Sequence, residues 1–296
     1  MGEELAKTYA AAREVFRIAD NVLGFELSAL CWNGPKEALD DTYNTQPALY
    51  VCGIAALRAL EEAAGAGFRP AFMAGHSLGE ITALVCAGAL DFEDGLDLVR
   101  QRGRLMKLAG EREPGGMAAV LTLELDMLIE ICAQASSATG SPVDVANDNC
   151  PGQVVISGHN YALDRAIKMA LDAGAKRVIR LPVSVAAHSP LMESVVEEYS
   201  SVVDSKLFLE PQISVIANTT VLPLETPTDI RAELCDQLIS PVRWTETVQF
   251  LLEQGMTDFI ELGSGKVLTS LLRRVDRDAI GYAVAAPDAI KQITEL

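Results

Sequence analysis

Long apolar segments are absent from this sequence of 296 residues. No run approaches the ~20 apolar residues that a membrane-spanning helix needs, and the longest clear candidate, residues 81–90, ends at Asp91. The N-terminus has Glu3 and Glu4 where a secretory signal peptide has basic residues followed by an apolar stretch. We therefore expect a cytoplasmic protein with no membrane partner.

Basic residues and closely spaced cysteines are also scarce. Lys and Arg total 24 against 41 Asp and Glu, a net charge of −17, which argues against nucleic-acid binding because that requires basic side chains to neutralise phosphates. The six cysteines contain no C-x-x-C pair, a pattern that indicates a reducing compartment and no structural zinc. No other spacing indicates a metal site or a resident cofactor.

The remaining composition, 49% hydrophobic and 22% charged, is typical of a globular chain. Short β-type apolar runs alternate with longer helical ones, which predicts an α/β fold with a mainly parallel sheet and helices on both faces. The expected strands are 71–74, 213–217 and 258–261, and the expected helices are 4–23, 46–63, 79–89, 92–109, 189–203 and 244–254.

Residues 113–184 have a different pattern, with the order β-α-β-β-α-β of a ferredoxin-like domain. We expect this small domain to be inserted in a larger one formed by residues 1–112 and 185–296. Its expected elements are strand 116–123, helix 124–136, strands 143–147 and 153–157, helix 160–173 and strand 177–183.

The most informative segment is residues 69–80, where an apolar strand enters Gly75-x-Ser77-x-Gly79 and a helix follows. This is the context of a G-x-S-x-G nucleophile elbow. We expect both glycines to be required, because a sharp turn brings the strand and helix backbones together and leaves no room for Cβ atoms. The serine hydroxyl then lies at a helix N-terminus, which favours a developing oxyanion. The alternative is a glycine-rich turn without chemistry.

A nucleophilic serine needs an oxyanion donor and a base. The backbone amide of Leu78 is the natural donor. The chain has three histidines. His76 adjoins Ser77, and neighbouring side chains point apart, while His159 is an expected helix cap. His188 is therefore the base by elimination, and its alternative is a satisfied surface or capping histidine.

Residues 263–267 (GSGKV) resemble half of a phosphate-binding P-loop. Val267 stands where Ser or Thr would hold magnesium, and the first glycine is misplaced. This segment is therefore not expected to bind a nucleotide.

Residues 75–80 (GHSLGE) resemble the active-site motif of malonyl-CoA:acyl carrier protein transacylases and polyketide-synthase acyltransferase domains. The match runs almost from end to end. It implies an α/β-hydrolase-like large catalytic domain with the ferredoxin-like insert. Four further segments carry the resemblance: 45–49 (TQPAL), 101–106 (QRGRLM), 149–155 (NCPGQVV) and 261–268 (ELGSGKVL).

The resemblance implies that Ser77 carries the acyl group and that His188 is its base, oriented by the backbone carbonyl of Gln237. The alternative for Gln237 is a residue that merely ends a helix. Arg102 matches the family's carboxylate clamp. A guanidinium fork binds a carboxylate through two parallel hydrogen bonds, which would select malonyl over acetyl groups. The alternative for Arg102 is an ordinary arginine on a helix surface.

Four further side chains are expected to bind substrate: Gln46, His76, Asn147 and Asn149. For Gln46 and the two asparagines, a capping or loop role is an equal alternative.

The implied reaction transfers a malonyl group from malonyl-CoA to the phosphopantetheine thiol of acyl carrier protein through malonyl-Ser77, for fatty-acid or polyketide synthesis. We expect a monomer with acyl carrier protein as its partner. The alternatives are an acyl-thioester hydrolase with the same Ser/His pair and a catalytically impaired subunit that binds carrier protein. For any one basic residue, a solvated surface charge is favoured over a role in docking. The candidates for a basic docking patch are Lys176, Arg177, Lys266, Arg273 and Arg274.

The sequence departs from the family pattern in two places. The family opens with a strand that runs into Gly-Gln-Gly, which supplies the second oxyanion donor, whereas we expect this sequence, which starts at Met1-Gly2-Glu3, to begin just past that segment. Ala187 precedes His188 where many malonyl-selective members have a bulkier residue, commonly Phe. We expect malonyl to be preferred, with some tolerance for an α-substituent.

Overall fold

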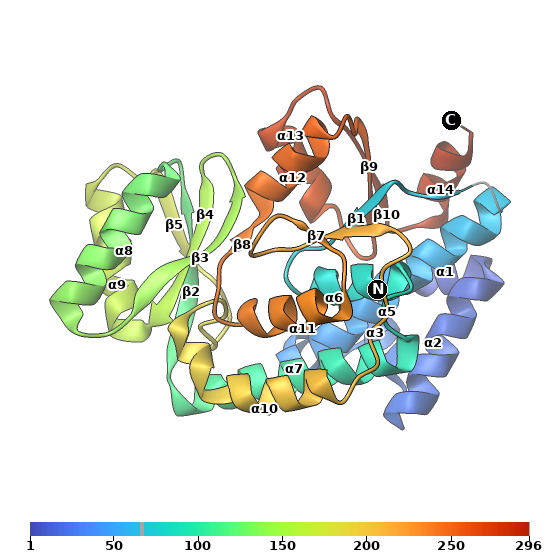
Figure 1. The fold of residues 1–296 in the computed structure, drawn as a ribbon, viewed down its shortest axis with the longest axis horizontal. Helices are drawn as coiled ribbons and strands as arrows, with labels where there is room; N and C mark the ends of the chain where they lie inside the picture. The colour runs from blue at the N-terminus through green and yellow to red at the C-terminus, as the bar shows by residue number, and fades with distance from the viewer. Residues whose placement is uncertain (66–67, 296) are drawn as a thin grey trace. The chain divides into compact units, whose positions relative to one another are not determined.

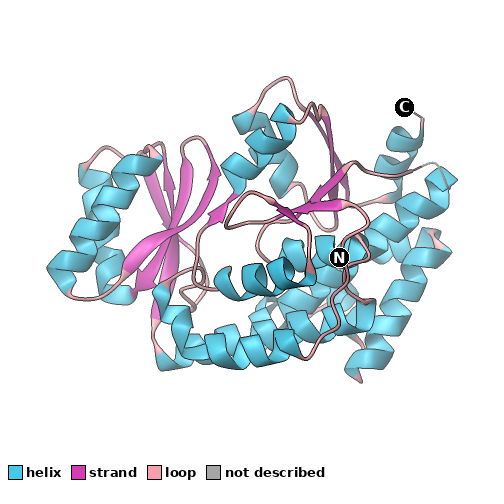
Figure 2. Ribbon diagram, viewed as in Figure 1, coloured by secondary structure: helices cyan, strands magenta, loops and turns pink. Residues whose placement is uncertain are grey.

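The computed structural model describes residues 1–65 and 68–295, which fold into two compact units (Figure 1). The first unit contains Met1–Gly103, Lys206–Ile216 and Leu251–Leu296, and the second contains Arg104–Ser205 and Ala217–Phe250. Helices and strands alternate along the chain, which confirms the α/β class (Figure 2).

Three stretches of the chain supply the elements of the first unit. They are α1 (Glu3–Thr8), α2 (Ala10–Leu23), α3 (Leu27–Asn33), α4 (Lys36–Asp40), α5 (Thr42–Ala64), β1 (Phe72–Ala74), α6 (Leu78–Cys86), β6 (Ser214–Ile216), β9 (Asp258–Leu262), α13 (Val267–Val275), β10 (Ile280–Val284), α14 (Pro287–Thr294) and most of α7 (Phe92–Arg112).

The long helix α5 lies at the centre of the first unit. It packs against α2, α6, α14 and strand β9. Strands β1 and β6 are parallel, with Phe72 opposite Ser214, and strands β9 and β10 are parallel, with Asp258 opposite Ile280. These two parallel pairs belong to separate sheets, whereas the sequence pattern predicts one.

Two stretches supply the elements of the second unit. They are β2 (Gly115–Leu121), α8 (Leu125–Thr139), β3 (Val143–Cys150), β4 (Gln153–His159), α9 (Asn160–Asp172), β5 (Arg177–Arg180), the 3₁₀ turn η2 (Pro190–Met192), α10 (Glu193–Asp204), β7 (Pro223–Leu224), α11 (Pro227–Asp236), β8 (Val242–Arg243) and most of α12 (Trp244–Glu253).

The second unit is built on a five-stranded sheet in the order β5-β2-β4-β3-β8. Strands β2, β3, β4 and β5 pair antiparallel, and β8 pairs parallel with β3. Helices α8 and α9 pack against each other and against this sheet (Figure 2). Apolar side chains of these helices and of β2, β3 and β4 form one buried cluster that includes Leu128, Ile156 and Leu163.

Several helices differ from the sequence-based expectation. The single helix expected over residues 4–23 is divided into α1 and α2, because Tyr9 between them adopts an extended conformation (φ −109°, ψ 129°). Helices α3, α4, α13 and α14 are not among the expected helices, and neither is α11. Its start carries a capping box formed by Thr226 and Asp229, with Pro227 in the first turn, a signal that the apolar pattern alone does not use.

Across the part of the chain that the structure describes, no helix combines the length and the apolar character that crossing a membrane would require.

The buried cluster predicts a clear contrast between two leucines of α9. Leu163 is fully buried, whereas Leu171 is half exposed. We expect Leu163→Ala to lower the free energy of unfolding by about 3 kcal/mol through lost burial and the cavity left behind, and Leu171→Ala by less than about 1 kcal/mol. Urea denaturation followed by circular dichroism measures both, and equal losses would contradict the packing described.

Candidate active site

The turn between β1 and α6 holds Ser77 in a strained backbone conformation. Ser77 has φ 52° and ψ −106°, a left-handed region that non-glycine residues rarely occupy. A Cβ placed on Gly75 would lie 1.9 Å from the backbone carbonyl carbon and oxygen of Gly79. Strand and helix therefore touch through bare backbone, and Ser77 lies at the apex of the turn. Such strain is typical of functional sites.

Gly79 does not share this constraint. A Cβ built there meets no atom within 4 Å. The expectation that both glycines are needed for close approach is therefore right for Gly75 and wrong for Gly79, because the contact involves the backbone of residue 79 and not the space that its side chain would fill.

Helix α6 starts directly after the serine. Leu78 is its first residue, so the Leu78 amide has no acceptor within the helix and lies where the helix dipole is positive. His76, on the other side of Ser77, is partly buried. A negative charge that develops beside Ser77 therefore meets a free backbone donor.

Arg102 on α7 contacts the serine. The Arg102 side chain is 2% exposed, and its Nη2 donates a hydrogen bond to Ser77 Oγ at 3.0 Å. Its Nη1 donates to Gln46 Oε1 at 2.9 Å, and Gln46 Nε2 in turn donates to Thr42 Oγ1 at 3.0 Å. The buried guanidinium is thus fixed beside the serine, because each of its two Nη atoms makes a hydrogen bond.

Close packing of α7 against the start of α5 brings these groups together. A Cβ on Gly103 would lie 2.6 Å from the carbonyl oxygen of Thr42, so only glycine allows this approach. Pro47 lacks the N–H that would reach the carbonyl of Tyr43 within α5, and this carbonyl instead accepts from Arg100 Nη1 at 2.7 Å. Gly103 thus positions Arg102, although sequence reasoning did not identify it.

His188, in the second unit, is held by the end of α11. The residue is 4% exposed and has φ 58°. Its Nδ1 lies 2.7 Å from the carbonyl oxygen of Gln237, and its backbone amide donates to Leu238 O at 3.1 Å. A carbonyl oxygen can only accept, so Nδ1 carries the hydrogen and Nε2 keeps the lone pair that a general base needs.

Hydrogen bonds between residues of the loop itself also stabilise the conformation around His188. Ser189, which is fully buried, donates from Oγ to Ala186 O at 2.7 Å and accepts from the Leu191 amide at 3.4 Å. A Cβ on Gly115 would lie 2.7 Å from the Cβ of Ala186, so strand β2 approaches the loop closely. The predicted helix over residues 189–203 starts at Ser189, but the contacts by which this serine holds the loop were not predicted.

The two asparagines lie on β3, where the pairing with β4 is irregular. Register shifts occur between Val145 and Asn147 and between Asp148 and Cys150. Asn147 and Asn149 are both buried, and Asn147 lies opposite Val242 of β8. Bulges of this kind redirect side chains and are common beside active sites.

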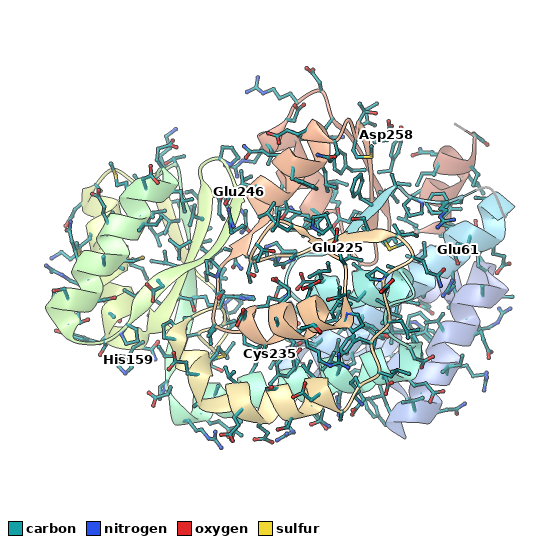
Figure 3. The ribbon with its side chains drawn as sticks, viewed as in Figure 1. Glu61, His159, Glu225, Cys235, Glu246 and Asp258 are labelled. Carbon is teal, nitrogen blue, oxygen red and sulfur yellow. The ribbon has the colours of Figure 1, made fainter. Side chains whose placement is uncertain are left out.

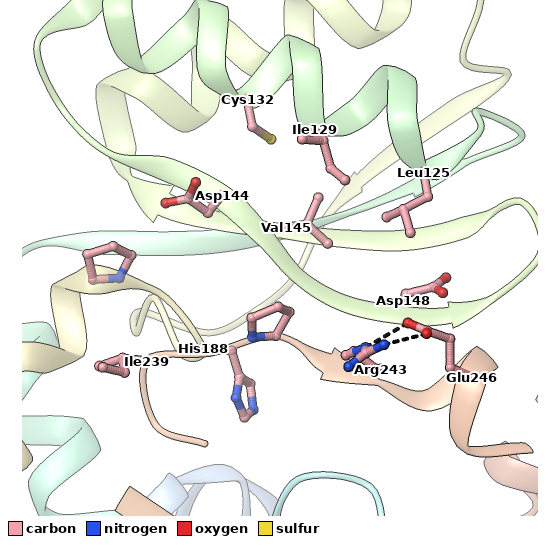
Figure 4. A pocket seen from close by; sticks show the side chains of 12 residues that line it. Leu125, Ile129, Cys132, Asp144, Val145, Asp148, His188, Ile239, Arg243 and Glu246 are labelled. Atoms are coloured by element: carbon pink, nitrogen blue, oxygen red, sulfur yellow. Dashed lines mark hydrogen bonds and ion pairs between the residues drawn. The ribbon is translucent and has the colours of Figure 1, made fainter. Parts of the chain in front are cut away.

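A cavity of about 530 Å³ in the second unit is lined by residues of α8, β3 and β8 together with His188 (Figure 4). Leu125, Ile129 and Val145 form an apolar wall. Burial raises the pKa of Asp148, and hydrogen bonding to Arg243 lowers the pKa of Glu246. Arg243 pairs with Glu246 through Nε at 2.7 Å and Nη2 at 2.5 Å (Figure 4).

The remaining predicted positions have plainer roles. His159 caps α9 by accepting from the Tyr161 amide at 3.3 Å, as expected (Figure 3). All six cysteines, which lie in the part that the structure describes, are free thiols. Within residues 1–65 and 68–295, no three His, Cys, Asp or Glu side chains gather into a group that could hold a metal ion.

A serine at a strained strand–helix turn is typical of one class of protein, the α/β enzymes that transfer or hydrolyse acyl groups. The second unit separately supplies a buried histidine whose Nδ1 faces a carbonyl. The chain matches the model of the acyl transferase domain over residues 1–295. It therefore belongs to the acyl transferase domain family and is an acyltransferase.

Individual relatives of the chain share one name within this family. The chain is 41% identical over 291 residues to the malonyl CoA-acyl carrier protein transacylase of Bacillus subtilis strain 168, covering 98% of this chain and 90% of that protein. It is 40% identical over 294 residues to the protein of the same name in Escherichia coli strain K12, covering 99% and 94%.

Solved structures agree with the sequence comparison. The malonyl CoA-acyl carrier protein transacylase of Coxiella burnetii superposes with a TM-score of 0.96 at 39% identity, covering 100% of this chain and 92% of that chain. A malonyl-transacylase in complex with its type II polyketide-synthase acyl carrier protein also gives 0.96 at 39% identity, covering 100% and 94%.

The elbow predicts opposite outcomes for its two glycines. We expect Gly75→Ala to lower the free energy of unfolding by about 3 kcal/mol and to abolish acylation of Ser77, because the new methyl group must displace backbone. Gly79→Ala, in a helix with open space around it, should be neutral or stabilising by up to about 1 kcal/mol. Thermal denaturation and intact-protein mass after acyl-CoA treatment report the two effects. A stable, acylated Gly75→Ala protein would contradict the steric account.

Proposed function

We propose that the protein transfers a malonyl group from malonyl-CoA to the phosphopantetheine thiol of acyl carrier protein. One observation carries the proposal: a buried guanidinium donates directly to the candidate nucleophile, Arg102 Nη2 to Ser77 Oγ. A cationic fork fixed beside a nucleophilic serine suits an acyl group that ends in a carboxylate. The names of the relatives support the same substrate and favour transfer over hydrolysis.

In the first half-reaction, His188 Nε2 accepts the proton of Ser77 as Oγ attacks the malonyl thioester carbonyl. The Leu78 amide stabilises the oxyanion, and the Gln237 carbonyl holds the imidazolium through Nδ1. Collapse of the tetrahedral intermediate breaks the carbon–sulfur bond, and the sulfur of coenzyme A leaves with the proton from His188. The malonyl ester remains on Ser77 with its carboxylate on Arg102.

In the second half-reaction, the phosphopantetheine thiol gives its proton to His188 and its sulfur attacks the ester carbonyl. Ser77 Oγ then leaves and recovers the proton, which restores the free enzyme. We assign Gln46 to holding the guanidinium of Arg102, and His76, Asn147 and Asn149 to contacts with the bound substrate. The carrier-protein complex of the structural relative supports acyl carrier protein as partner.

We also propose that residues 113–184 are a ferredoxin-like domain inserted in an α/β-hydrolase-like domain of residues 1–112 and 185–296. The strand order β5-β2-β4-β3 with antiparallel pairing, and two helices packed on that sheet, support the insert. Both strand pairs of the first unit, β1–β6 and β9–β10, are parallel, which supports mainly parallel pairing in the large domain, although in two sheets.

The test is intact-protein mass after brief mixing with malonyl-CoA or acetyl-CoA. The wild-type protein should gain one malonyl group, and Ser77→Ala should gain none. Arg102→Ala should slow malonyl uptake about 10- to 100-fold, because charged hydrogen bonds of about 1.5–3 kcal/mol are lost, while acetyl uptake should change little.

Arg104→Ala is the matched control, since Arg104 lies on the same helix with a 41% exposed side chain paired to Glu198. It should leave both rates within about twofold, as is usual for an exposed ion pair. Equal uptake of acetyl and malonyl groups by the wild-type protein would rule out the carboxylate clamp. Release of free malonate in place of transfer to carrier protein would establish the hydrolase alternative.

A further inference from the structure

The end of α11 binds both N–H groups of His188, so the orientation of its imidazole depends on where that helix ends. The Gln237 carbonyl accepts from the ring and the Leu238 carbonyl accepts from the backbone. The peptide group between these two residues is also fixed on its other side, where the Leu238 amide donates to Cys235 O at 3.3 Å. Any movement of the last turn of α11 would therefore rotate the ring.

Glu233 lies one turn before Gln237 and is 4% exposed. Its Oε1 accepts from the Thr219 amide at 2.9 Å, and its Oε2 accepts from the Thr219 hydroxyl. Its own carbonyl oxygen accepts from the Gln237 amide at 2.8 Å. One residue thus joins the end of α11 to Thr219 through its side chain and to Gln237 through its backbone.

Thr219 is itself held from the opposite side. Arg243 donates from Nη1 to Thr219 O at 3.0 Å and from its backbone amide to Asn218 O at 3.0 Å. The remaining donors of this guanidinium pair with Glu246, as Figure 4 shows. Arg243 belongs to β8, which pairs with β3. Thr219 is therefore attached to β8, which lies beside the strand that carries Asn147 and Asn149.

We propose that Glu233 is a positioning residue for His188. Its carboxylate anchors the last turn of α11 to Thr219 and thereby sets the two carbonyls that orient the imidazole. The inference rests on the proposed function for the role of His188 as base.

A carboxylate matches this contact well. Thr219 presents an N–H and an O–H, and the carboxylate offers an acceptor oxygen to each. A glutamine at this position can accept from the N–H and, once the hydroxyl turns its hydrogen away, donate to the Thr219 oxygen, so the charge-assisted hydrogen bonds become weaker neutral ones. An alanine removes the partner of both donors of Thr219, a half-buried residue, and so releases the helix end that holds His188.

The experiment compares Glu233→Gln and Glu233→Ala with Thr226→Ala. The control removes the hydroxyl that caps the other end of the same helix, accepting from the Asp229 amide, and so weakens α11 without touching the contacts of His188. We expect Glu233→Ala to lower kcat for malonyl transfer about tenfold, with KM within about twofold, because the base is misplaced and the substrate contacts are not. The kcat of Glu233→Gln should lie between those of the wild-type protein and Glu233→Ala, and Thr226→Ala should keep the wild-type kcat.

A second readout observes the histidine directly. The chain has three histidines, so ¹⁵N-histidine labelling yields few imidazole signals, and His188→Gln assigns the one of interest. The Nδ1–H proton of His188, hydrogen-bonded to a buried carbonyl, should give a protected downfield resonance in the wild-type protein. This resonance should shift or disappear in both Glu233 variants and persist in Thr226→Ala.

The outcomes separate the two proposals. A wild-type protein that takes up no malonyl group would overturn the proposed function, and the resonance alone would then decide the role of Glu233. An unchanged Nδ1–H signal in the Glu233 variants, or a kcat equal to that of Thr226→Ala at equal loss of stability, would overturn the positioning role. If Glu233→Ala does not fold, kcat and the Nδ1–H signal of Glu233→Gln are compared with those of Thr226→Ala in its place.

Discussion

The backbone contact at Gly75 is the steric constraint on which the candidate site depends. Because β1 and α6 touch with no side chain between them, the residue at the turn is forced into a left-handed conformation and the helix starts one residue later. That arrangement puts the hydroxyl of Ser77 beside the first free amide of α6 and within reach of Arg102. A wider turn would separate Ser77 Oγ from both groups.

Buried polar contacts, each satisfied by a defined partner, then refine the geometry within each unit. In the first unit, the guanidinium of Arg102 is held by Gln46, and Gln46 by Thr42. In the second, Glu233 and Arg243 both bind Thr219. Networks of this kind orient a group strongly because breaking any one contact leaves a buried donor or acceptor unsatisfied.

Local signals made a large part of this arrangement predictable from the sequence. The elbow could be predicted because its geometry depends on consecutive residues, and the α/β class because periodicity is a local property. The contact between Arg102 and Gln46 could not, since it depends on the close approach of α7 to α5 at Gly103. No spacing in the sequence shows that approach.

In the second unit, too, a contact between distant parts of the chain could not be predicted from the sequence. Helix α11 has a start signal in Thr226 and Asp229, but its interior has no strong apolar period, so it was missed. Without that helix, Glu233 had no assigned neighbour, and its role could be inferred only from the contacts with Thr219. Long-range hydrogen bonds of this kind leave no trace in local sequence patterns.

The hydrogen bond from Arg102 to Ser77 also affects the lone pairs of the serine oxygen. A guanidinium that donates to the serine oxygen occupies one of the lone pairs with which that oxygen would attack. In the reaction proposed above, a substrate that ends in a carboxylate competes for the same guanidinium, so this hydrogen bond is exchanged for a pair with the acyl group. Binding of the acyl carboxylate and loss of the resting contact of Ser77 Oγ would then be a single event.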